Sequence, residues 1–329
     1  MITGIGGQDG SYLAELLLEQ DYEVFGVVRR PPSDRYENLE PIRERIELIQ
    51  ADLLDELSLV NALESCRPEE VYNLASVSFV PMSWNEPVLT AEFAAVGVTT
   101  MLESIRAVDD GIRFYQASSS EIFGEPGEVP QTEQTALAPL TPYGVAKAYG
   151  HFITRSYRLR YGLHASSGIL YNHESPRRPL DFLPRKVAHA AAEIKLGLKG
   201  EVGLGSLDAR RDWGYAKDYV RAMWLMLQQD EAGDYVIASG ETHSVGELVD
   251  LAFEPSRVSD VVSIHTRKQR ALGQVEELIE PPRHAAPAPA LQHTDARVGD
   301  RRGRCNLDTP VLGAVVYQKH LPVGERLSL

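Results

Sequence analysis

The sequence predicts an α/β protein with a doubly wound parallel sheet and a smaller C-terminal lobe. In the first half of the 329-residue chain, short β-branched runs alternate with longer amphipathic segments, as in βαβ units. A glycine-rich loop precedes the first amphipathic segment, and beyond residue 170 the chain becomes richer in Pro, Arg and Gly. We therefore expect a dinucleotide-binding domain at 1–170, a lobe interleaved with this core at 171–253, and a divergent, poorly ordered tail at 254–329.

Hydrophobic patterning places the individual elements. Strands are expected at residues 23–28, 46–50, 70–74, 113–117 and 165–170. Helices are expected at residues 12–20, 57–65, 88–107, 144–161, 183–196, 216–228 and 245–253. Ser244 and Glu247 form a capping box at the start of the last helix, which satisfies otherwise free amide groups. Only residues 1–3 precede the glycine loop, so the first strand is expected to be a short stub.

Composition excludes several functional classes. A formal charge of −14 argues against broad affinity for nucleic acid, whose backbone requires clustered Lys and Arg. The two cysteines, Cys66 and Cys305, provide neither a disulfide framework nor a CxxC metal site. We find no charged-then-apolar leader and no apolar run near eighteen residues, so we expect a cytoplasmic protein that does not enter a membrane.

The glycine loop has the spacing of a dinucleotide site. Gly4, Gly7 and Gly10 allow a tight turn and the close approach of a pyrophosphate to a helix N-terminus. About twenty residues further on, NAD-binding proteins commonly carry an acidic residue, but this chain has Arg29 and Arg30. Two cations suit a 2′-phosphate. The alternative is an ordinary turn and a solvated strand end, but loop, spacing and charge together favour a Rossmann-type fold that binds NADP.

A tyrosine and a lysine are placed for hydride-transfer chemistry. Tyr143 and Lys147 stand one helical turn apart and share a helix face. A tyrosine hydroxyl has a pKa near 10, and both the lysine ammonium and a nicotinamide charge would favour the phenolate. Pairs with this spacing also occur by chance on many helices.

The run of serines that ends in Glu121 adds a second chemistry. It follows the strand at 113–117 and therefore lies at the carboxyl edge of the sheet, where ligands bind. Ser119 is placed to hydrogen-bond a substrate oxygen, and Glu121 would point to the same side if the strand continues. A carboxylate there can remove a proton next to a carbonyl, which turns an oxidation into an elimination. The alternatives are a polar turn and a solvent-facing carboxylate.

These residues resemble those of the GDP-mannose 4,6-dehydratases, a family of extended short-chain dehydrogenases/reductases. The resemblance covers about residues 2–253 and rests on six blocks, at residues 3–13, 115–121, 143–147, 171–178 (YNHESPRR), 207–214 (LDARRDWG) and 240–245. The blocks at 171–178 and 207–214 are the most diagnostic of the family.

The resemblance implies NADP-dependent dehydration of GDP-mannose to GDP-4-keto-6-deoxymannose. Tyr143 with Lys147 would take the proton of the sugar 4-hydroxyl, Glu121 would remove the C5 proton, and Ser119, where relatives often carry Thr, would steady the 4-oxygen. The implied cofactor contacts are Gly4, Gly7, Gln8, Asp9, Gly10, Arg29, Arg30, Asp52, Leu53, Leu74, Ala75, Ser76, Tyr143, Lys147, His173 and Arg178. The implied substrate contacts are Ser119, Glu121, Asn172, Lys186 and Arg211, the last three chosen for the GDP diphosphate.

The resemblance also implies a homodimer or homotetramer, with residues 29–45 near a neighbouring subunit's cofactor, and no metal. Residues 254–329 do not match the family pattern. They contain seven prolines and nine arginines, and we expect a helix at 268–279 and an extended Pro/Ala linker at 281–291. The tail is either a divergent ending or a shifted reading frame.

Two other readings stay open. A related nucleotide-sugar epimerase or reductase would share the fold and the tyrosine–lysine pair. An inactive NADP-binding or assembly protein would fit the short start and the unmatched tail.

Overall fold

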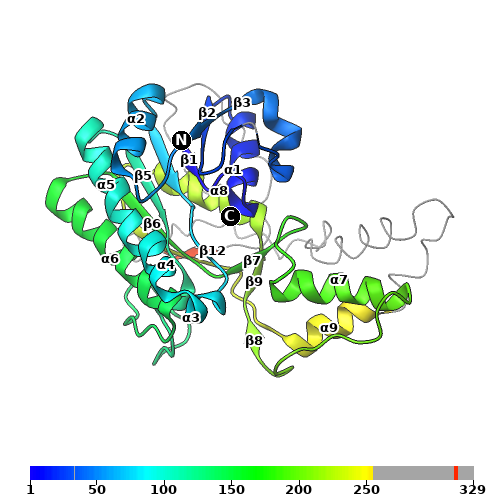
Figure 1. Cartoon of the computed structure of the whole chain (residues 1–329). Helices are drawn as coiled ribbons and strands as arrows, with labels where there is room; N and C mark the ends of the chain where they lie inside the picture. Colours follow the sequence, from blue (N-terminus) through cyan, green and yellow to red (C-terminus); the bar gives the residue numbers. More distant parts are fainter. Residues whose placement is uncertain (33, 255–314, 318–329) are drawn as a thin grey trace, which may run out of the picture.

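A central sheet of seven parallel strands and one antiparallel strand organises the computed structural model, which describes residues 1–32, 34–254 and 315–317 (Figure 1). The strand order is β12-β10-β6-β5-β4-β1-β2-β3. The strands are β1 (Ile2–Thr3), β2 (Val24–Val28), β3 (Ile46–Gln50), β4 (Glu70–Asn73), β5 (Arg113–Ala117), β6 (Ala165–Leu170), β10 (Asp234–Ala238) and β12 (Val315–Tyr317). The doubly wound parallel sheet predicted from the sequence is confirmed.

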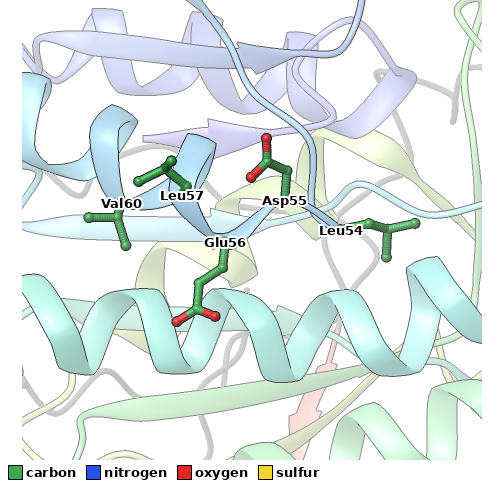
Figure 2. A pocket seen from close by; sticks show the side chains of 5 residues that line it. All are labelled: Leu54, Asp55, Glu56, Leu57 and Val60. Atoms are coloured by element: carbon green, nitrogen blue, oxygen red, sulfur yellow. The ribbon is translucent and has the colours of Figure 1, made fainter.

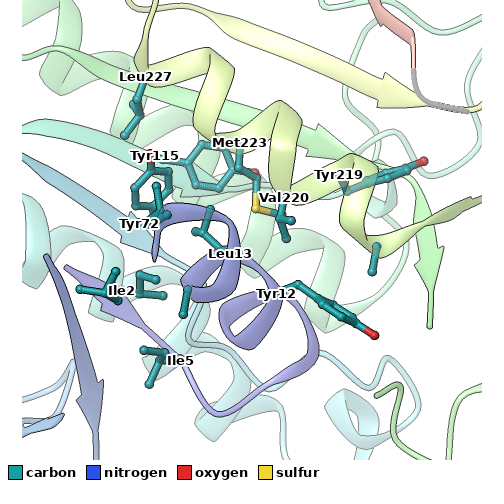
Figure 3. Packing of buried hydrophobic residues seen from close by; sticks show 14 of the residues in the cluster. Ile2, Ile5, Tyr12, Leu13, Tyr72, Tyr115, Tyr219, Val220, Met223 and Leu227 are labelled. Atoms are coloured by element: carbon teal, nitrogen blue, oxygen red, sulfur yellow. The ribbon is translucent and has the colours of Figure 1, made fainter. Parts of the chain in front are cut away.

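Two helices, α1 (Gln8–Glu19) and α8 (Ala216–Leu227), cover one face of the sheet. Figure 3 shows Leu13 of α1 and Met223 of α8 packed over Tyr72 and Tyr115 of the sheet. All four side chains are fully buried. Burial of side chains of this size contributes about 1.5–3 kcal/mol each, so this layer fixes the position of the α1 N-terminus.

The opposite face is covered by α2 (Glu56–Cys66), α5 (Gly97–Val108) and α6 (Pro142–Tyr161) (Figure 1). The single helix predicted at 88–107 is α4 (Pro87–Ala91), a π-helical turn (Glu92–Val96) and α5 in succession. A π-turn inserts one extra residue per turn and often lies at a functional site. Here its Phe93 lines the large cavity described below.

One helical segment corrects the expectation that no apolar run approaches membrane-spanning length. Residues Pro87–Val108 are long and apolar enough by length and composition, the one such helix among the described residues. More than half of its most apolar window is buried inside the protein, where α5 packs on α2 and α6. A core helix of this kind passes the same test, so the finding is weak support for a membrane span.

An outer lobe extends from the carboxyl edge of the sheet (Figure 1). It contains α7 (Leu183–Lys195) and α9 (Val245–Phe253), which pack through Val187, Ala191 and Ala252. Two short ribbons join it to the core: β7 (Asn172–Glu174) pairs with β9 (Trp213–Tyr215), and β8 (Arg210–Arg211) pairs with β11 (His243–Ser244). Residues 171–253 are thus interleaved with the core, since α8 and β10 belong to the main layers.

Most predicted elements are confirmed within a few residues, and the capping box of Ser244 and Glu247 is present. The short ribbons and β10 were not predicted, nor were α3 (Met82–Asn85) and the 3-10 helix η1 (Glu37–Arg45). The stub at residues 1–3 forms β1, a fully buried strand of two residues. The predicted helix at 268–279, the linker at 281–291 and Cys305 lie outside the described residues. Cys66 is a free thiol.

Candidate active site

A cavity of about 1260 Å³ opens at the carboxyl ends of the parallel strands, between the core and the outer lobe. Every site residue predicted from the sequence lines it. The dinucleotide side holds Gly4, Gly7, Gln8, Asp9, Gly10, Arg29, Arg30, Asp52, Leu53, Leu74, Ala75, Ser76, His173 and Arg178. The reactive and substrate side holds Ser119, Glu121, Tyr143, Lys147, Asn172, Lys186 and Arg211. Their joint location is observed, and their individual roles stay predictions.

The glycine loop turns so tightly that only glycine fits at two positions. Gly4 has a φ of +68°, and a Cβ there would lie 2.9 Å from the backbone of Ala75. A Cβ on Gly10 would lie 2.5 Å from the Gly4 carbonyl oxygen. The helix α1 starts at Gln8, four residues earlier than predicted, so its free amide groups lie within the loop. This arrangement suits a pyrophosphate, because the amides and the helix dipole both favour an anion.

The two arginines of the proposed 2′-phosphate site are exposed at the end of β2. The Arg29 guanidinium lies 4.8 Å from the centre of the Phe93 ring, and that of Arg30 lies 5.1 Å from the Tyr36 ring. Arg30 also lies 3.8 Å from Asp34, an exposed ion pair that a phosphate can displace at little cost. These contacts hold both cations at the cavity rim.

The cavity contains two buried hydroxyl groups that have no polar partner among the described residues. Ser76 Oγ, after β4, and Ser118 Oγ, after β5, are buried without a hydrogen-bond partner among the described residues. Burying a hydroxyl without a partner is costly, so such groups commonly meet a ligand or water. Together with the glycine loop they show that the residues present fit a bound dinucleotide. Ser118 was not predicted as a site residue, because no sequence pattern reveals that a hydroxyl will be buried without a partner.

Glu121 reaches the cavity by a route that the sequence did not predict. The strand β5 ends at Ala117, and the chain turns into a 3-10 helix, η3 (Ser120–Ile122). The expectation that a continued strand aligns Ser119 with Glu121 is therefore wrong. Ser119 Oγ instead caps η3 by accepting a hydrogen bond of 3.3 Å from the Glu121 amide. Both side chains still line the cavity.

Tyr143 lies in the first turn of α6, directly beside η3. Thr141 caps this helix by accepting a hydrogen bond of 2.9 Å from the Gly144 amide. A Cβ on Gly144 would lie 2.6 Å from the Glu121 carbonyl oxygen, so the two segments pack without room for a side chain. The close packing sets the position of the tyrosine relative to the carboxylate.

The tyrosine and lysine are both buried, and this changes their acidities. Burial raises the pKa of Tyr143 to about 12, although a hydrogen bond with Ser119 and the charge of Arg178 act to lower it. Burial lowers the pKa of Lys147 to about 8. Its Nζ donates a hydrogen bond of 2.9 Å to the Ala117 carbonyl and lies 5.7 Å from the Tyr143 ring centre. The expected stabilisation of phenolate by Lys147 is thus outweighed by burial in the protein alone.

Asp9 and His173 tie the dinucleotide loop to the outer lobe. His173 Nε2 lies 2.8 Å from an Asp9 carboxylate oxygen, and His173 Nδ1 lies 2.7 Å from the Tyr171 carbonyl. Burial would raise the pKa of Asp9, but His173 lowers it to about 2. Burial would lower the pKa of His173, but Asp9 raises it above its usual value. Each partner of the pair therefore favours the ionised form of the other.

The proposed diphosphate ligands all belong to the lobe side of the cavity. Asn172 lies in β7, while Lys186 in α7 and Arg211 in β8 are exposed. Lys186 Nζ donates a hydrogen bond of 2.9 Å to the Gly203 carbonyl, and Arg211 donates one of 2.8 Å to the Arg210 carbonyl. Both cations are thus held by neutral groups and keep their charge available to an anion.

Aromatic side chains form part of the cavity wall, and the sequence analysis did not predict them as site residues. Phe79 and Phe182 contact edge to face with ring centres 5.5 Å apart, and Trp213 lies in β9. All three line the cavity. Trp213 lies within the block at 207–214, and Phe182 follows the block at 171–178. Only polar and charged residues of these blocks were interpreted, so the aromatic residues beside them were the sequence signal for this wall.

A second, open hollow of about 470 Å³ lies at the start of α2. Figure 2 shows its lining, which consists of Leu54, Asp55, Glu56, Leu57 and Val60. None of the predicted site residues belongs to it. Among the described residues, no group of three or more His, Cys, Asp or Glu side chains is placed to hold a metal ion.

The fold defines a member of the Rossmann-type short-chain dehydrogenase/reductase class. The structure is similar to the NAD complex of UDP-glucose 4-epimerase from Thermus thermophilus, with a TM-score of 0.68 and 26% identity over 78% of this chain and 82% of that chain.

Sequence comparison defines the family within this class. The GDP-mannose 4,6 dehydratase family model matches residues 1–297. The chain is 47% identical to the GDP-mannose 4,6-dehydratase of Sinorhizobium fredii, over 77% of this chain and 75% of that protein. It is also 47% identical to the human GDP-mannose 4,6 dehydratase, over 77% of this chain and 71% of that protein. The chain therefore belongs to the GDP-mannose 4,6-dehydratase family of hydro-lyases.

The ion pair of Asp9 and His173 predicts a pH-dependent loss of stability on substitution. The contribution of Asp9 is present above pH 3.8 and is lost as the pH falls toward 2, whereas that of His173 is present below pH 6.5 and is lost as the pH rises above it. Asp9→Asn should therefore lower the free energy of unfolding by about 1–2 kcal/mol at pH 5.5 and by less at pH 9.

Urea unfolding at the two pH values measures this difference. Glu40→Gln removes the exposed ion pair with Arg35 and serves as the matched control, with little expected change at either pH because exposed pairs contribute little. An equal loss at both pH values for Asp9→Asn would show that the ion pair contributes nothing beyond packing.

Proposed function

We propose that this protein catalyses the NADP-dependent dehydration of GDP-mannose to GDP-4-keto-6-deoxymannose. The observation that carries the proposal is the packing of η3 against the α6 N-terminus, which brings Glu121 to the same cavity as Tyr143 and Lys147. Hydride transfer alone requires the tyrosine and lysine. A carboxylate beside them supplies the base that an elimination needs.

The first step is oxidation at C4 of the mannose ring. Tyr143 takes the proton of the 4-hydroxyl, and Ser119, which lines the same cavity, is placed to hold the same oxygen. The glycine loop and the arginines at the end of β2 would hold a nicotinamide cofactor, which when bound would supply the hydride acceptor for C4 and the hydride donor for C6. Tyr143 must become phenolate, so the positive charges that accompany ligand binding have to offset the burial that raises its pKa.

The second step is loss of water between C5 and C6. A ketone at C4 acidifies the C5 hydrogen, and Glu121 removes it as a proton while the C6 hydroxyl leaves. Glu121 then protonates the departing hydroxyl, which gives water. The proton taken by Tyr143 returns to C5 when C6 receives the hydride, so both residues end in their starting states and no net oxidation occurs.

The cofactor and the sugar nucleotide approach from different sides of the cavity. The glycine loop and the two arginines at the end of β2 suit the pyrophosphate and the 2′-phosphate of NADP. Asn172, Lys186 and Arg211 suit the GDP diphosphate on the lobe side. The reactive residues line the same cavity as both groups, and transfer between bound partners requires such a shared site.

The two alternative functions differ from dehydration in their products. A 4-epimerase would invert C4 and keep the C6 hydroxyl, and a reductase would consume cofactor stoichiometrically. The similarity to UDP-glucose 4-epimerase supports the shared fold, while Glu121 favours elimination. An inactive cofactor-binding protein would release no product.

Replacement of Glu121 should separate oxidation from elimination. With GDP-mannose and catalytic NADP, the wild-type protein should form the 4-keto-6-deoxy sugar without accumulating NADPH. Glu121→Gln should lower the rate of dehydration by at least about 100-fold, because general base catalysis of this kind contributes 10²–10⁴-fold. Mass spectrometry of the sugar nucleotide gives the rate.

Glu125→Gln is the matched control for this variant, since Glu125 is exposed, follows η3 and does not line the cavity. Its dehydration rate should equal that of the wild type. Undiminished dehydration by Glu121→Gln would refute the assigned role, and stoichiometric NADPH formation by the wild type would refute dehydration itself.

Removal of the arginine pair should change the choice of cofactor. The double variant Arg29→Ser, Arg30→Ser should weaken NADP binding by at least about tenfold, because charge-assisted phosphate contacts are worth roughly 1.5–3 kcal/mol. NAD, which lacks the 2′-phosphate, should be affected by less than about threefold.

Titration calorimetry with each dinucleotide tests the choice. Arg35→Ser is the control, because Arg35 is exposed, pairs with Glu40 and does not line the cavity. Equal weakening of NADP and NAD by the double variant would contradict a 2′-phosphate site.

We also propose a homo-oligomer formed through an apolar stripe on α6. Val145, Tyr149, Phe152 and Leu159 are between 45% and 74% exposed and fall at helical spacing on one side of this helix. Exposed apolar residues that cluster in this way favour association with a second copy of the chain.

A charge in this stripe should dissociate the oligomer. Phe152→Glu should shift the sedimentation-equilibrium mass from a multiple of 36.4 kDa toward the monomer. Leu57→Glu, at a comparably exposed apolar residue of α2, should leave the mass unchanged. A wild-type protein that remains monomeric at micromolar concentration would contradict the proposal.

A further inference from the structure

Glu174 is a buried carboxyl group that the proposed reaction does not use. It ends β7, next to His173, and its side chain is 4% exposed although the residue lines the cavity. Its Oε2 lies 3.3 Å from Arg178 Nε. Neither of these two buried atoms has a hydrogen-bond partner among the described residues. The pair is close but poorly aligned, which leaves both groups open to another partner.

Arg178 is held at the cavity wall by this carboxylate and by an aromatic ring. Its guanidinium carbon lies 3.6 Å from the centre of the Phe182 ring, and its ion pair with Glu174 uses Nε. Guanidinium groups bind phosphate through two parallel N–H groups, so an anion in the cavity competes with Glu174 for Arg178.

The charges around Glu174 set the cost of that competition. Arg178 and His173 favour its ionised form, while burial and the nearby Asp9 oppose it. Burial is the largest of these influences and raises the pKa of Glu174 to about 7. Two tyrosines lie near it: Tyr215 pairs with Glu174 between β7 and β9, and Tyr219 stacks on His173 with ring centres 4.5 Å apart. Burial raises the pKa of Tyr219 well above 10. Glu174 thus changes protonation near neutral pH.

We propose that Glu174 positions Arg178 in the free protein and takes up a proton from solvent when a phosphate group of a nucleotide ligand binds Arg178. The inference rests on the proposed function in that the ligand is NADP or a GDP nucleotide. The balance is simple: the carboxylate gains one proton and becomes a neutral acid, and the guanidinium transfers its ion pair from Glu174 to the phosphate. No bond other than the O–H bond forms or breaks.

This exchange has a physical reason. A phosphate that approaches Arg178 adds negative charge beside a carboxylate that is already buried, and it removes the cation that favours ionisation. Two neighbouring anions in a site of low dielectric cannot both stay charged, so Glu174 accepts a proton. Proton uptake and ligand binding are then linked, and ligand affinity must rise as the pH falls through the range in which Glu174 titrates.

Calorimetric titrations in buffers of different ionisation enthalpy count the protons that are taken up. We would titrate the full chain with NADP alone and, separately, with GDP alone at pH 7.5 in Pipes and in Tris. The wild type should take up a substantial fraction of one proton with whichever ligand places its phosphate at Arg178. Between pH 8.5 and pH 6.5 the affinity for that ligand should rise by up to about tenfold for each unit by which the ligand raises the pKa.

The variants assign the proton to its residue. Glu174→Gln keeps the shape but has no proton to exchange, so the uptake that is specific to the wild type should vanish and the pH dependence should flatten. Ionisations of His173 and of the ligand phosphates remain in this variant and cancel in the comparison. Glu15→Gln is the matched control. Glu15, on α1, pairs with Arg177, which is the chain neighbour of Arg178, and Glu15 does not line the cavity. It should take up protons as the wild type does.

The outcomes separate this inference from the proposed function. Binding of NADP or GDP by the wild type without proton uptake, or with uptake that is unchanged in Glu174→Gln, would overturn the role of Glu174 and leave the dehydratase proposal intact. Failure of both ligands to bind would overturn the proposed function and this inference with it. Ligand binding by the wild type without proton uptake overturns the inference even if a variant does not fold.

Discussion

The structure depends on the junction between the N-terminus of α1 and the segment that begins with β7. The contacts that form it include the Asp9–His173 ion pair, a hydrogen bond from Gln8 to the His173 carbonyl, one from Ser175 to Gln8, and one from Arg177 to Ser11. In each contact one partner belongs to the dinucleotide loop and the start of α1, and the other belongs to the segment that leads into the lobe. The glycine loop and the lobe side of the cavity are consequently held in fixed positions relative to one another. Because these contacts are buried or partly buried, they are screened less by salt than surface pairs.

Burial sets the acidity of three groups beside the cavity. Tyr143, Lys147 and Glu174 are all buried beside the cavity, and in each case burial opposes the charged form. In bulk water, nearby charges would change these pKa values only slightly, whereas a site of low dielectric constant amplifies the effect of every charge that a ligand brings. A tyrosine with a raised pKa is a poor base until ligand binding places positive charge beside it. The pKa of each group therefore depends on the charges that a ligand brings into the cavity, whose wall includes Phe79 and Phe182.

Local spacing explains what could be predicted from the sequence. The glycine loop and the tyrosine–lysine pair need only a few consecutive residues, and the structure places them where the pattern indicated. Glu121 was assigned to the right cavity for a wrong geometric reason, since a 3-10 turn brings it there in place of a continued strand. The pairing of β7 with β9 joins residues about forty positions apart, and no local pattern specifies such a partner. The unpartnered hydroxyl of Ser118 and the acidity of Tyr143 depend on the neighbours that folding supplies, so a sequence cannot display them.

The central claim is that one hydride leaves C4 of the sugar and returns to C6 of the same molecule, with Tyr143 and Glu121 moving the protons. GDP-mannose that carries deuterium at C4 tests this claim most directly, with NADP present in catalytic amount and the product examined by NMR. We predict that the deuterium appears at C6 of a 4-keto-6-deoxy product and that no NADPH accumulates. Deuterium that remains at C4, or that leaves the sugar into a stoichiometric pool of reduced cofactor, would contradict the assignment.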